Sequence, residues 1–291
     1  MKKSEVKFIN VTKKFNETTA VNNISCSFEP GTLTTLLGPS GCGKTTSLRL
    51  IAGLERATQG KIFIDNDDVT LLPATDRDVS MVFQSYALFP HMTVIENVAY
   101  GLKMINVSKE EYKNKSLQTL KLVGLEGYEN RMPSELSGGQ QQRVAVARAI
   151  VLEPRVLLFD EPLSNLDAKL RRQVREDIRE LQQALGVTTI YVTHDQEEAL
   201  AISDKVIVMN NAIIAQEGSP KDLYSNPKTS FVANFIGDAN IVKAKINSKE
   251  NHLYSISLGE INIALTSNLN LQNEVSVAVR PESITIQSNK T

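Results

Sequence analysis

A strand-like stretch followed by a glycine-rich turn restricts the fold of this chain more than any other feature. Residues 33–37 end at a glycine, and the run Gly38-Pro-Ser-Gly-Cys-Gly-Lys-Thr45 follows directly. A short apolar run that ends at a glycine is typical of a buried strand entering a tight turn. The next residues favour a helix over 45–52, with Gly53 just past its end. A strand, a turn and a helix in this order predict a layered α/β fold.

The turn has the glycine, lysine and threonine spacing of a P-loop. Glycines there let backbone N–H groups point at phosphate oxygens, and the N-terminus of the following helix adds favourable partial charge. Lys44 would reach the β and γ phosphates of a nucleotide, and Thr45 would bind Mg²⁺. A turn that only caps a helix is the alternative, but the strand and the helix around it favour phosphate binding. The expected nucleotide-binding residues are Gly38, Pro39, Ser40, Gly41, Cys42, Gly43, Lys44, Thr45 and Thr46, and Cys42 fills a position that the pattern leaves free.

Strand and helix patterns alternate along most of the chain, which predicts a mostly parallel sheet. Further strands are expected at 6–11, 24–28, 61–64, 79–83, 156–159, 189–192 and 205–209. Further helices are expected at 108–124, 139–152 and 169–185 and from about 196, and 12–23 is expected to be a polar connection. After Gly237 the pattern changes to short alternating strands at 241–246, 254–258, 260–265, 275–279 and 284–287. We therefore expect an α/β domain over 1–235, with a helical subdomain at about 85–155, and a small all-β domain over 236–291.

Composition excludes several classes of protein. The formal net charge is −1, which gives no electrostatic reason to expect a nucleic-acid partner. The two cysteines, Cys26 and Cys42, lie far apart, which suits a reducing cytosol and argues against a disulfide scaffold or a zinc site. Neither a signal peptide nor an apolar run long enough to cross a bilayer is evident. Any role at a membrane would therefore go through a partner.

A second apolar strand ends in two carboxylates. Residues 156–159 are Val-Leu-Leu-Phe, and Asp160 and Glu161 follow. Beside a P-loop, the first carboxylate would hold Mg²⁺ through water, and the second would lie near the γ-phosphate and polarise the attacking water. An acidic helix cap after a strand is the alternative, and the P-loop in the same chain argues against it.

The run Leu136-Ser-Gly-Gly-Gln140 predicts a second helix N-terminus that can bind an anion. A simple cap would explain Ser137 but not the two glycines after it. At this point the sequence resembles the ABC ATPase family, whose signature motif is Leu-Ser-Gly-Gly-Gln. The resemblance implies that Ser137, Gly138, Gly139 and Gln140 contact ATP.

Further motifs of this family follow in its order. Gln84 matches the glutamine of the Q-loop, Ser164-Asn-Leu-Asp167 matches the D-loop, and His194 matches the switch histidine. Phe15 matches the aromatic position that stacks on adenine. The resemblance implies Glu161, His194, Gln84 and Lys44 as catalytic residues. It implies Thr45, Gln84 and Asp160 as the Mg²⁺ residues.

The resemblance covers about residues 5–235 and implies a mechanism. Two copies would face head to tail, with ATP between the P-loop of one copy and residues 137–140 of the other. Neither copy alone would have a full active site. Closure on ATP would drive a membrane permease, and hydrolysis would reopen the pair.

Among ABC proteins, the sequence resembles an importer subunit for small solutes. Residues 83–93 look like the coupling segment of such importers, and the tail with Arg280-Pro-Glu-Ser283 looks like a short TOBE-type domain. An exporter with fused membrane spans, a ribosome-acting protein with two cassettes and a coiled-coil repair ATPase all fit less well. The implied partners are a second copy, two permease subunits at the cytoplasmic face of the membrane and, indirectly, an extracytoplasmic solute-binding protein.

The resemblance to importers also predicts which residues contact the permease and which solute is transported. Tyr86, Leu88 and Phe89 are expected to contact the permease, and the alternative is that these side chains fill the core of the helical subdomain. Residues 73–81 and 237–240 look closest to iron(III) importers. Importers of polyamines, 2-aminoethylphosphonate and sugars are the alternatives, and a soluble ABC ATPase without a transport role ranks after them.

Overall fold

The structure is a computed structural model that describes residues 3–267, 270–271 and 273–284. The chain divides into two compact units, Met1–Pro220 and Lys221–Thr291. In the described ranges, no helix combines the length and the apolar character needed to cross a bilayer.

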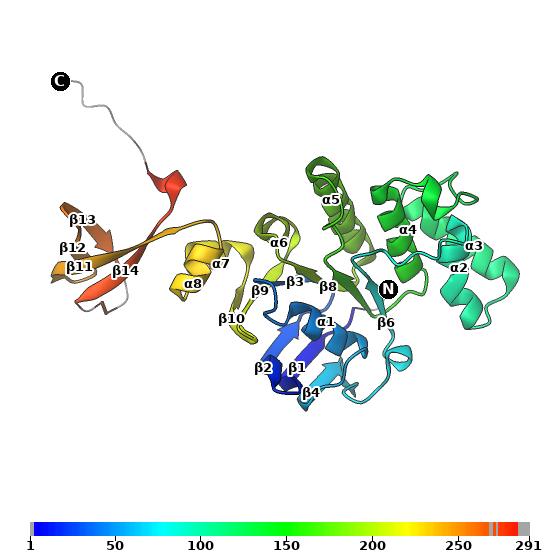
Figure 1. The fold of residues 1–291 in the computed structure, drawn as a ribbon, viewed down its shortest axis with the longest axis horizontal. Coiled ribbons are helices and arrows are strands. Elements are labelled where there is room, and N and C mark those ends of the chain that lie inside the picture. The colour runs from blue at the N-terminus through cyan, green and yellow to red at the C-terminus, as the bar shows by residue number, and fades with distance from the viewer. Residues whose placement is uncertain (1–2, 268–269, 272, 285–291) are drawn as a thin grey trace, which may run out of the picture. The chain divides into compact units, whose positions relative to one another are not determined.

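A six-stranded sheet forms the centre of the first unit (Figure 1). Its neighbouring strands are, in spatial order, β10 (Ile213–Gly218), β9 (Lys205–Asn210), β3 (Leu33–Leu37), β8 (Thr188–Thr193), β7 (Val156–Asp160) and β6 (Val79–Val82). Only the β9–β10 pair is antiparallel. Every residue of β3, β7 and β8 is buried, as expected for central strands covered on both faces. The predicted mostly parallel sheet is confirmed.

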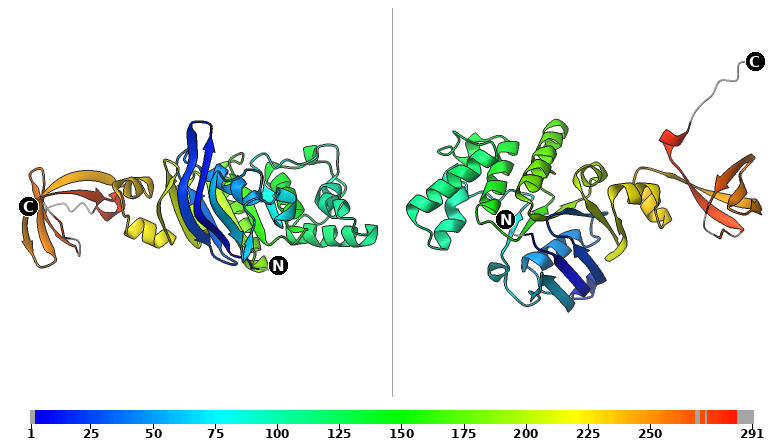
Figure 2. Two further views of the ribbon diagram at one scale, coloured as in Figure 1. Left: turned by 90° about the horizontal axis from the view of Figure 1, so that it is seen from below. Right: turned by 180° about the vertical axis from the view of Figure 1, so that it is seen from behind.

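A separate antiparallel sheet contains β2 (Thr18–Phe28), β1 (Val6–Phe15), β4 (Gln59–Ile64) and β5 (Asp67–Asp68), in that order. The expected polar connection at 12–23 is wrong, because β1 and β2 continue through it to a tight turn and form one long hairpin (Figure 2). Polar residues suit these strands, since an antiparallel sheet can face water on one side. Register shifts along the pair also interrupt the strict alternation that would have shown the strands.

Helices lie on both sides of the large sheet and make the helical part of the first unit. Their bounds are α1 Lys44–Ala52, α2 Val94–Met104, α3 Lys109–Leu122, α4 Gly138–Ile150, α5 Ala168–Leu185 and α6 Gln196–Ile202. One buried cluster joins α2, α4 and α5 to strands β7 and β8, and a second joins α1 to both sheets. Helix α2 was not predicted from the sequence, although Thr93 and Glu96 form a capping box that could have revealed it.

The second unit is built from helices α7 (Pro220–Ser225) and α8 (Ser230–Phe235) and an antiparallel sheet. The spatial order of the sheet is β13 (Ile261–Thr266), β12 (Leu253–Leu258), β11 (Asn240–Glu250) and β14 (Glu274–Val279). Helix α8 packs on β11 and β14, and the Arg280 guanidinium donates to the carbonyls of Tyr224, Ile236 and Gly237. These contacts hold both helices with the sheet, whereas the sequence-based division grouped them with the α/β domain. Of the strand expected at 284–287, residues 285–287 lie outside the described residues.

Candidate functional site

The loop between β3 and α1 has the conformation that its glycines permit. Gly43 has a φ of 104°, and a Cβ at this residue would lie 2.3 Å from the carbonyl oxygen of Ala20. Only glycine therefore fits, and the β1–β2 hairpin lies directly beside the loop. The Lys44 ammonium folds back over the turn and donates to the carbonyls of Gly38 at 2.8 Å and Pro39 at 3.0 Å. These carbonyls hold a cation at the mouth of the turn.

The hydroxyl of Thr45 meets the first carboxylate of the acidic pair. Thr45 Oγ1 donates to Asp160 Oδ1 at 3.0 Å, because the C-terminal ends of β3 and β7 lie at one edge of the parallel sheet. Burial raises the pKa of the Asp160 carboxyl, against the lowering effects of the Thr45 hydroxyl and the nearby charges of Arg49 and Lys44. A buried carboxylate of this kind is best stabilised by a cation.

Two hard oxygen donors fit a magnesium ion better than a metal that prefers nitrogen or sulfur. Within the described residues, no cluster of three or more His, Cys, Asp or Glu side chains could hold a metal ion by itself. A metal ion here would therefore need phosphate and water ligands as well, which is how Mg²⁺ is usually bound at nucleotide sites.

The second carboxylate of the pair lies opposite the predicted histidine. Glu161 Oε2 is 3.2 Å from Nδ1 of His194, which follows the end of β8. Glu161 has a φ of 46°, a left-handed conformation that is uncommon outside glycine and is often found at functional sites. Its N–H donates to the carbonyl of Val192 at 3.1 Å, which ties the residue to the neighbouring strand. The two side chains line a cavity of about 60 Å³.

A layer of polar residues behind this pair was assigned no role from the sequence. Glu198 is 4% exposed and accepts from Thr193 Oγ1 at 2.8 Å and from the Tyr191 hydroxyl at 3.2 Å. Arg171 donates to the carbonyl of Leu166 at 3.1 Å, and its guanidinium lies 3.8 Å from Glu198. The layer connects the end of the D-loop motif to the loop that carries the histidine. Arg171 lies one helical turn after Asp167, the N-cap residue of α5. This spacing is common in helices and does not indicate a functional role for Arg171.

The segment after β6 also reaches the D-loop. Asn165 Nδ2 donates to the backbone carbonyl of Gln84 at 3.0 Å, and the side chain of Gln84 is exposed. Tyr86 does not belong to the expected coupling surface, because its side chain is 7% exposed and lies in the core. Leu88 and Phe89 are partly buried, and the Phe89 ring lies 4.7 Å from that of Tyr100.

The residues of the signature motif open helix α4. Ser137 Oγ accepts from the N–H of Gln140, and Gln140 Oε1 accepts from the N–H of Ser137, so the two form a capping box. A Cβ at Gly138 would lie 3.0 Å from the Leu166 side chain, and one at Gly139 would lie 3.0 Å from that of Leu170. The double glycine, which a cap alone does not explain, lets α4 approach the start of α5 closely.

Phe15 lies at the end of β1, where the hairpin turns. Phe15 as a whole residue is 43% exposed, and the Lys13 ammonium lies 4.4 Å from the ring centroid. The ring is thus available to another molecule and does not fill the core.

A P-loop, a threonine–aspartate pair and a glutamate–histidine pair at one edge of a parallel sheet define a P-loop ATPase. Residues 21–164 match the family model described as ABC transporter. The chain is 59% identical to "Fe(3+) ions import ATP-binding protein FbpC" of Brucella abortus. The match covers 97% of this chain and 80% of that protein. It is 52% identical to the protein of the same name in Escherichia coli O157:H7, over 99% of this chain and 81% of that protein.

Solved structures are similar as well. The dimeric structure of MJ0796, a bacterial ABC transporter cassette, is 34% identical, with a TM-score of 0.65 over 74% of this chain and 98% of that one. CbiO1 of Clostridium perfringens, part of an ABC transporter complex, is 28% identical, with a TM-score of 0.71 over 79% of this chain and 94% of that one. The chain therefore belongs to the ABC transporter family, among its import ATP-binding proteins, and it binds and hydrolyses ATP.

Proposed function

We propose that two copies of this chain hydrolyse ATP head to tail, each supplying its P-loop to one nucleotide and its signature residues to the other. The observation that supports this most is the meeting of Thr45 with Asp160, and of Glu161 with His194, at the C-terminal ends of β3, β7 and β8. Ligands of open α/β sheets bind at this edge. The dimeric relative MJ0796 supports the pairing.

Each residue of the site has a role in this proposal. The Lys44 ammonium leaves the carbonyls of Gly38 and Pro39 to contact the β and γ phosphates, and the backbone N–H groups of residues 40–46 surround them. Mg²⁺, held by Thr45, Asp160 and Gln84, would neutralise phosphate charge. Phe15 stacks on adenine.

Glu161 accepts a proton from the attacking water, and His194 holds the Glu161 carboxylate in place through Nδ1. Ser137 and the N–H groups at the start of α4 contact the γ-phosphate of the nucleotide on the opposite copy. Because the phosphate contacts then come from both copies, one copy alone is not expected to hydrolyse ATP efficiently.

Replacement of Glu161 tests the catalytic assignment. Glu161→Gln is isosteric and is expected to keep Mg–ATP binding, while turnover falls by at least about 10²-fold, in the range of general-base losses. Size-exclusion chromatography is expected to show an ATP-bound dimer. Glu197→Gln, an exposed carboxylate near the same site, is the matched control and should keep wild-type turnover. Near-wild-type hydrolysis by Glu161→Gln would contradict the assignment.

The proposed cargo is iron(III). The support is the name shared by the relatives, import ATP-binding proteins for Fe(3+) ions that are 52–59% identical over nearly the whole chain. In this proposal the chain works at the cytoplasmic face of the membrane, bound to two permease subunits. An extracytoplasmic binding protein delivers the ion to them.

Reconstitution of the transport complex tests which solute is the cargo. The complex is assembled with the permease and binding protein encoded beside this chain. ATPase activity is then measured with the binding protein loaded with iron(III), spermidine, 2-aminoethylphosphonate or a sugar. Stimulation by the iron(III)-loaded protein is expected. Stimulation by another ligand and none by iron(III) would overturn the cargo and leave the ATPase assignment intact.

A further inference from the structure

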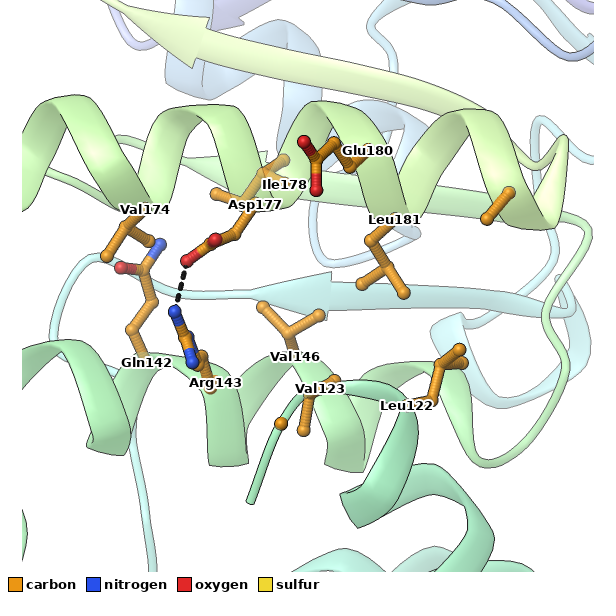
Figure 3. Close-up of a pocket in the computed structure, with 12 residues that line it drawn as sticks. Leu122, Val123, Gln142, Arg143, Val146, Val174, Asp177, Ile178, Glu180 and Leu181 are labelled. Atoms are coloured by element: carbon orange, nitrogen blue, oxygen red, sulfur yellow. Dashed lines mark hydrogen bonds and ion pairs between the residues drawn. The ribbon is translucent and has the colours of Figure 1, made fainter. Parts of the chain in front are cut away.

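The base of a nucleotide at the P-loop needs a surface to rest on, and the apolar cavity of the first unit does not supply it. That cavity has a volume of about 330 Å³ and lies between α4, α5 and the end of α3 (Figure 3). The β1–β2 hairpin, which lies directly beside the P-loop, contributes none of the residues that line the cavity. Phe8 and Phe28 of this hairpin are buried, so Phe15 is its exposed aromatic residue.

One face of the Phe15 ring is already covered by Lys13. The Lys13 ammonium lies over the ring, 4.4 Å from its centroid. The faces of an aromatic ring carry partial negative charge, so a cation in this position is attracted to the ring. Phe15 remains 43% exposed in spite of this contact. The ring face opposite Lys13 is therefore the one left for a base.

The Lys13 ammonium is itself held in place by the residues that follow α1. It lies 2.9 Å from the Glu55 carboxylate and donates to the carbonyl of Arg56 at 3.0 Å. The side chain of Lys13 is only 13% exposed, and a partly buried ion pair is screened less by salt than an exposed one. Because α1 begins at Lys44, the helix that starts at the phosphate-binding turn also leads to the residues that fix Lys13.

A fixed cation on one face of the ring helps a base to stack on the other face in two ways. First, it holds the ring in one orientation, so less side-chain entropy is lost when the base binds. Second, it draws electron density away from the free face, which reduces the repulsion between two stacked π-systems. Neither effect requires Lys13 to contact the nucleotide.

We propose that Lys13 is a positioning residue for nucleotide binding, which holds the Phe15 ring with one face free so that the ring stacks on the adenine base. This inference rests on the adenine stacking proposed above. Because Lys13 acts through Phe15, its loss weakens the binding of the base and leaves the binding of the phosphates unchanged.

Replacement of Lys13 by methionine removes the charge and keeps an unbranched side chain. The backbone of the hairpin should stay in place, because the Thr58 N–H donates to the Thr12 carbonyl at 2.8 Å and the Thr58 hydroxyl accepts from the Lys14 N–H at 2.9 Å. The dissociation constant of Mg–ADP, measured by isothermal titration calorimetry, is expected to rise roughly twofold to tenfold in Lys13→Met, the range expected for one cation–π contact. That of Mg–pyrophosphate, which has no base, should not change.

Lys14→Met, an exposed neighbour with the same change in charge, is the matched control and should bind both ligands normally. Equal weakening of ADP and pyrophosphate in Lys13→Met would mean that Lys13 supports the P-loop and not the base, and would overturn the proposal. Unchanged ADP binding would overturn it as well. In steady-state ATPase assays, Lys13→Met is expected to raise KM for ATP, with kcat near wild type. A lower kcat with an unchanged KM would contradict this role.

A double variant tests whether Lys13 acts through Phe15. Phe15→Ala alone is expected to weaken ADP binding by at least about fivefold, the lower end of losses for base–aromatic stacking. Lys13→Met should then weaken binding no further in the Phe15→Ala background, and a further loss of the same size as in the wild type would overturn the proposal. Weak binding by Phe15→Ala with normal binding by Lys13→Met would remove Lys13 and leave the adenine stacking intact. Normal ADP binding by Phe15→Ala would instead contradict the stacking itself.

Discussion

At the scale of single residues, the buried carboxylate of Glu198 connects the histidine loop to the sheet and to α5. It accepts hydrogen bonds from Thr193 and Tyr191 and lies near the Arg171 guanidinium. Burial is the main cause that raises the pKa of this carboxyl above its ordinary value of 4.5, and the charge of Asp195 adds to the effect. The hydrogen bonds and Arg171 lower the pKa but do not reverse the shift.

The raised pKa of Glu198 determines the direction in which the stability of the protein changes with pH. The folded protein holds the Glu198 proton more tightly than the unfolded chain, so ionisation of Glu198 lowers the free energy of unfolding as pH rises above 4.5. A glutamine side chain at this position would accept the same two hydrogen bonds without ionising. The melting temperature of Glu198→Gln relative to wild type is therefore expected to rise from pH 4.5 to neutral pH. A relative stability that falls over this range would mean that the pKa is lowered.

Which residues of the site could be predicted depends on how local their geometry is. The P-loop residues are set by one turn, so their spacing alone predicts the cradle around the phosphates. The meeting of Thr45 and Asp160 follows from parallel strands ending at one edge. The contacts of Arg171 could not be predicted, because they depend on how α5 packs against the loop after β8.

At the scale of elements, the segment after β6 has a conformation that could not be predicted from the sequence. The sequence predicted an aromatic coupling surface, but Tyr86 and Ala87 adopt left-handed conformations, and the Tyr86 side chain is buried. The backbone of this segment is held by side chains from two helices. Arg148 donates to the carbonyls of Tyr86 and Ala87, and Asn97 bonds both the N–H and the carbonyl of Phe89. The Arg148 contacts join residues about sixty positions apart, so no local pattern reveals them.

The same contacts make Phe89 a sharp test of permease coupling. Asn97 holds the backbone of Phe89 whatever its side chain, so Phe89→Ala should leave the segment in place. ATPase activity of the isolated subunit is expected to stay near wild type, and transport by the reconstituted complex is expected to be lost. Met104→Ala, at an exposed position on α2, is the control and should transport normally. Wild-type transport by Phe89→Ala would remove Phe89 from the coupling surface.

At the scale of the whole molecule, the fold class could be predicted because strand and helix patterns alternate so clearly. The division into units was harder to predict. Helices α7 and α8 precede the boundary that the sequence predicted near residue 235, yet the Arg280 contacts bind them to the sheet of the second unit. An arginine more than forty residues away in the sequence gives no sign of this.

The central claim is that one active site needs two copies of the chain. Lys44→Ala removes the ammonium that is proposed to contact the phosphates. Gly138→Asp places a carboxylate where the γ-phosphate of the opposite copy is expected, and only the end of the Leu166 side chain must move to admit it. Each variant alone is expected to be inactive. In a mixed dimer, one site carries both defects and the other carries neither.

The ATPase rate of the mixture is the measurement that tests this claim most directly. Two different affinity tags show that mixed dimers form. The mixture is expected to recover roughly a quarter of the wild-type rate, since random pairing makes half of the dimers mixed and each of these has one intact site. A mixture that contains mixed dimers and yet stays as inactive as either variant alone would contradict the head-to-tail arrangement.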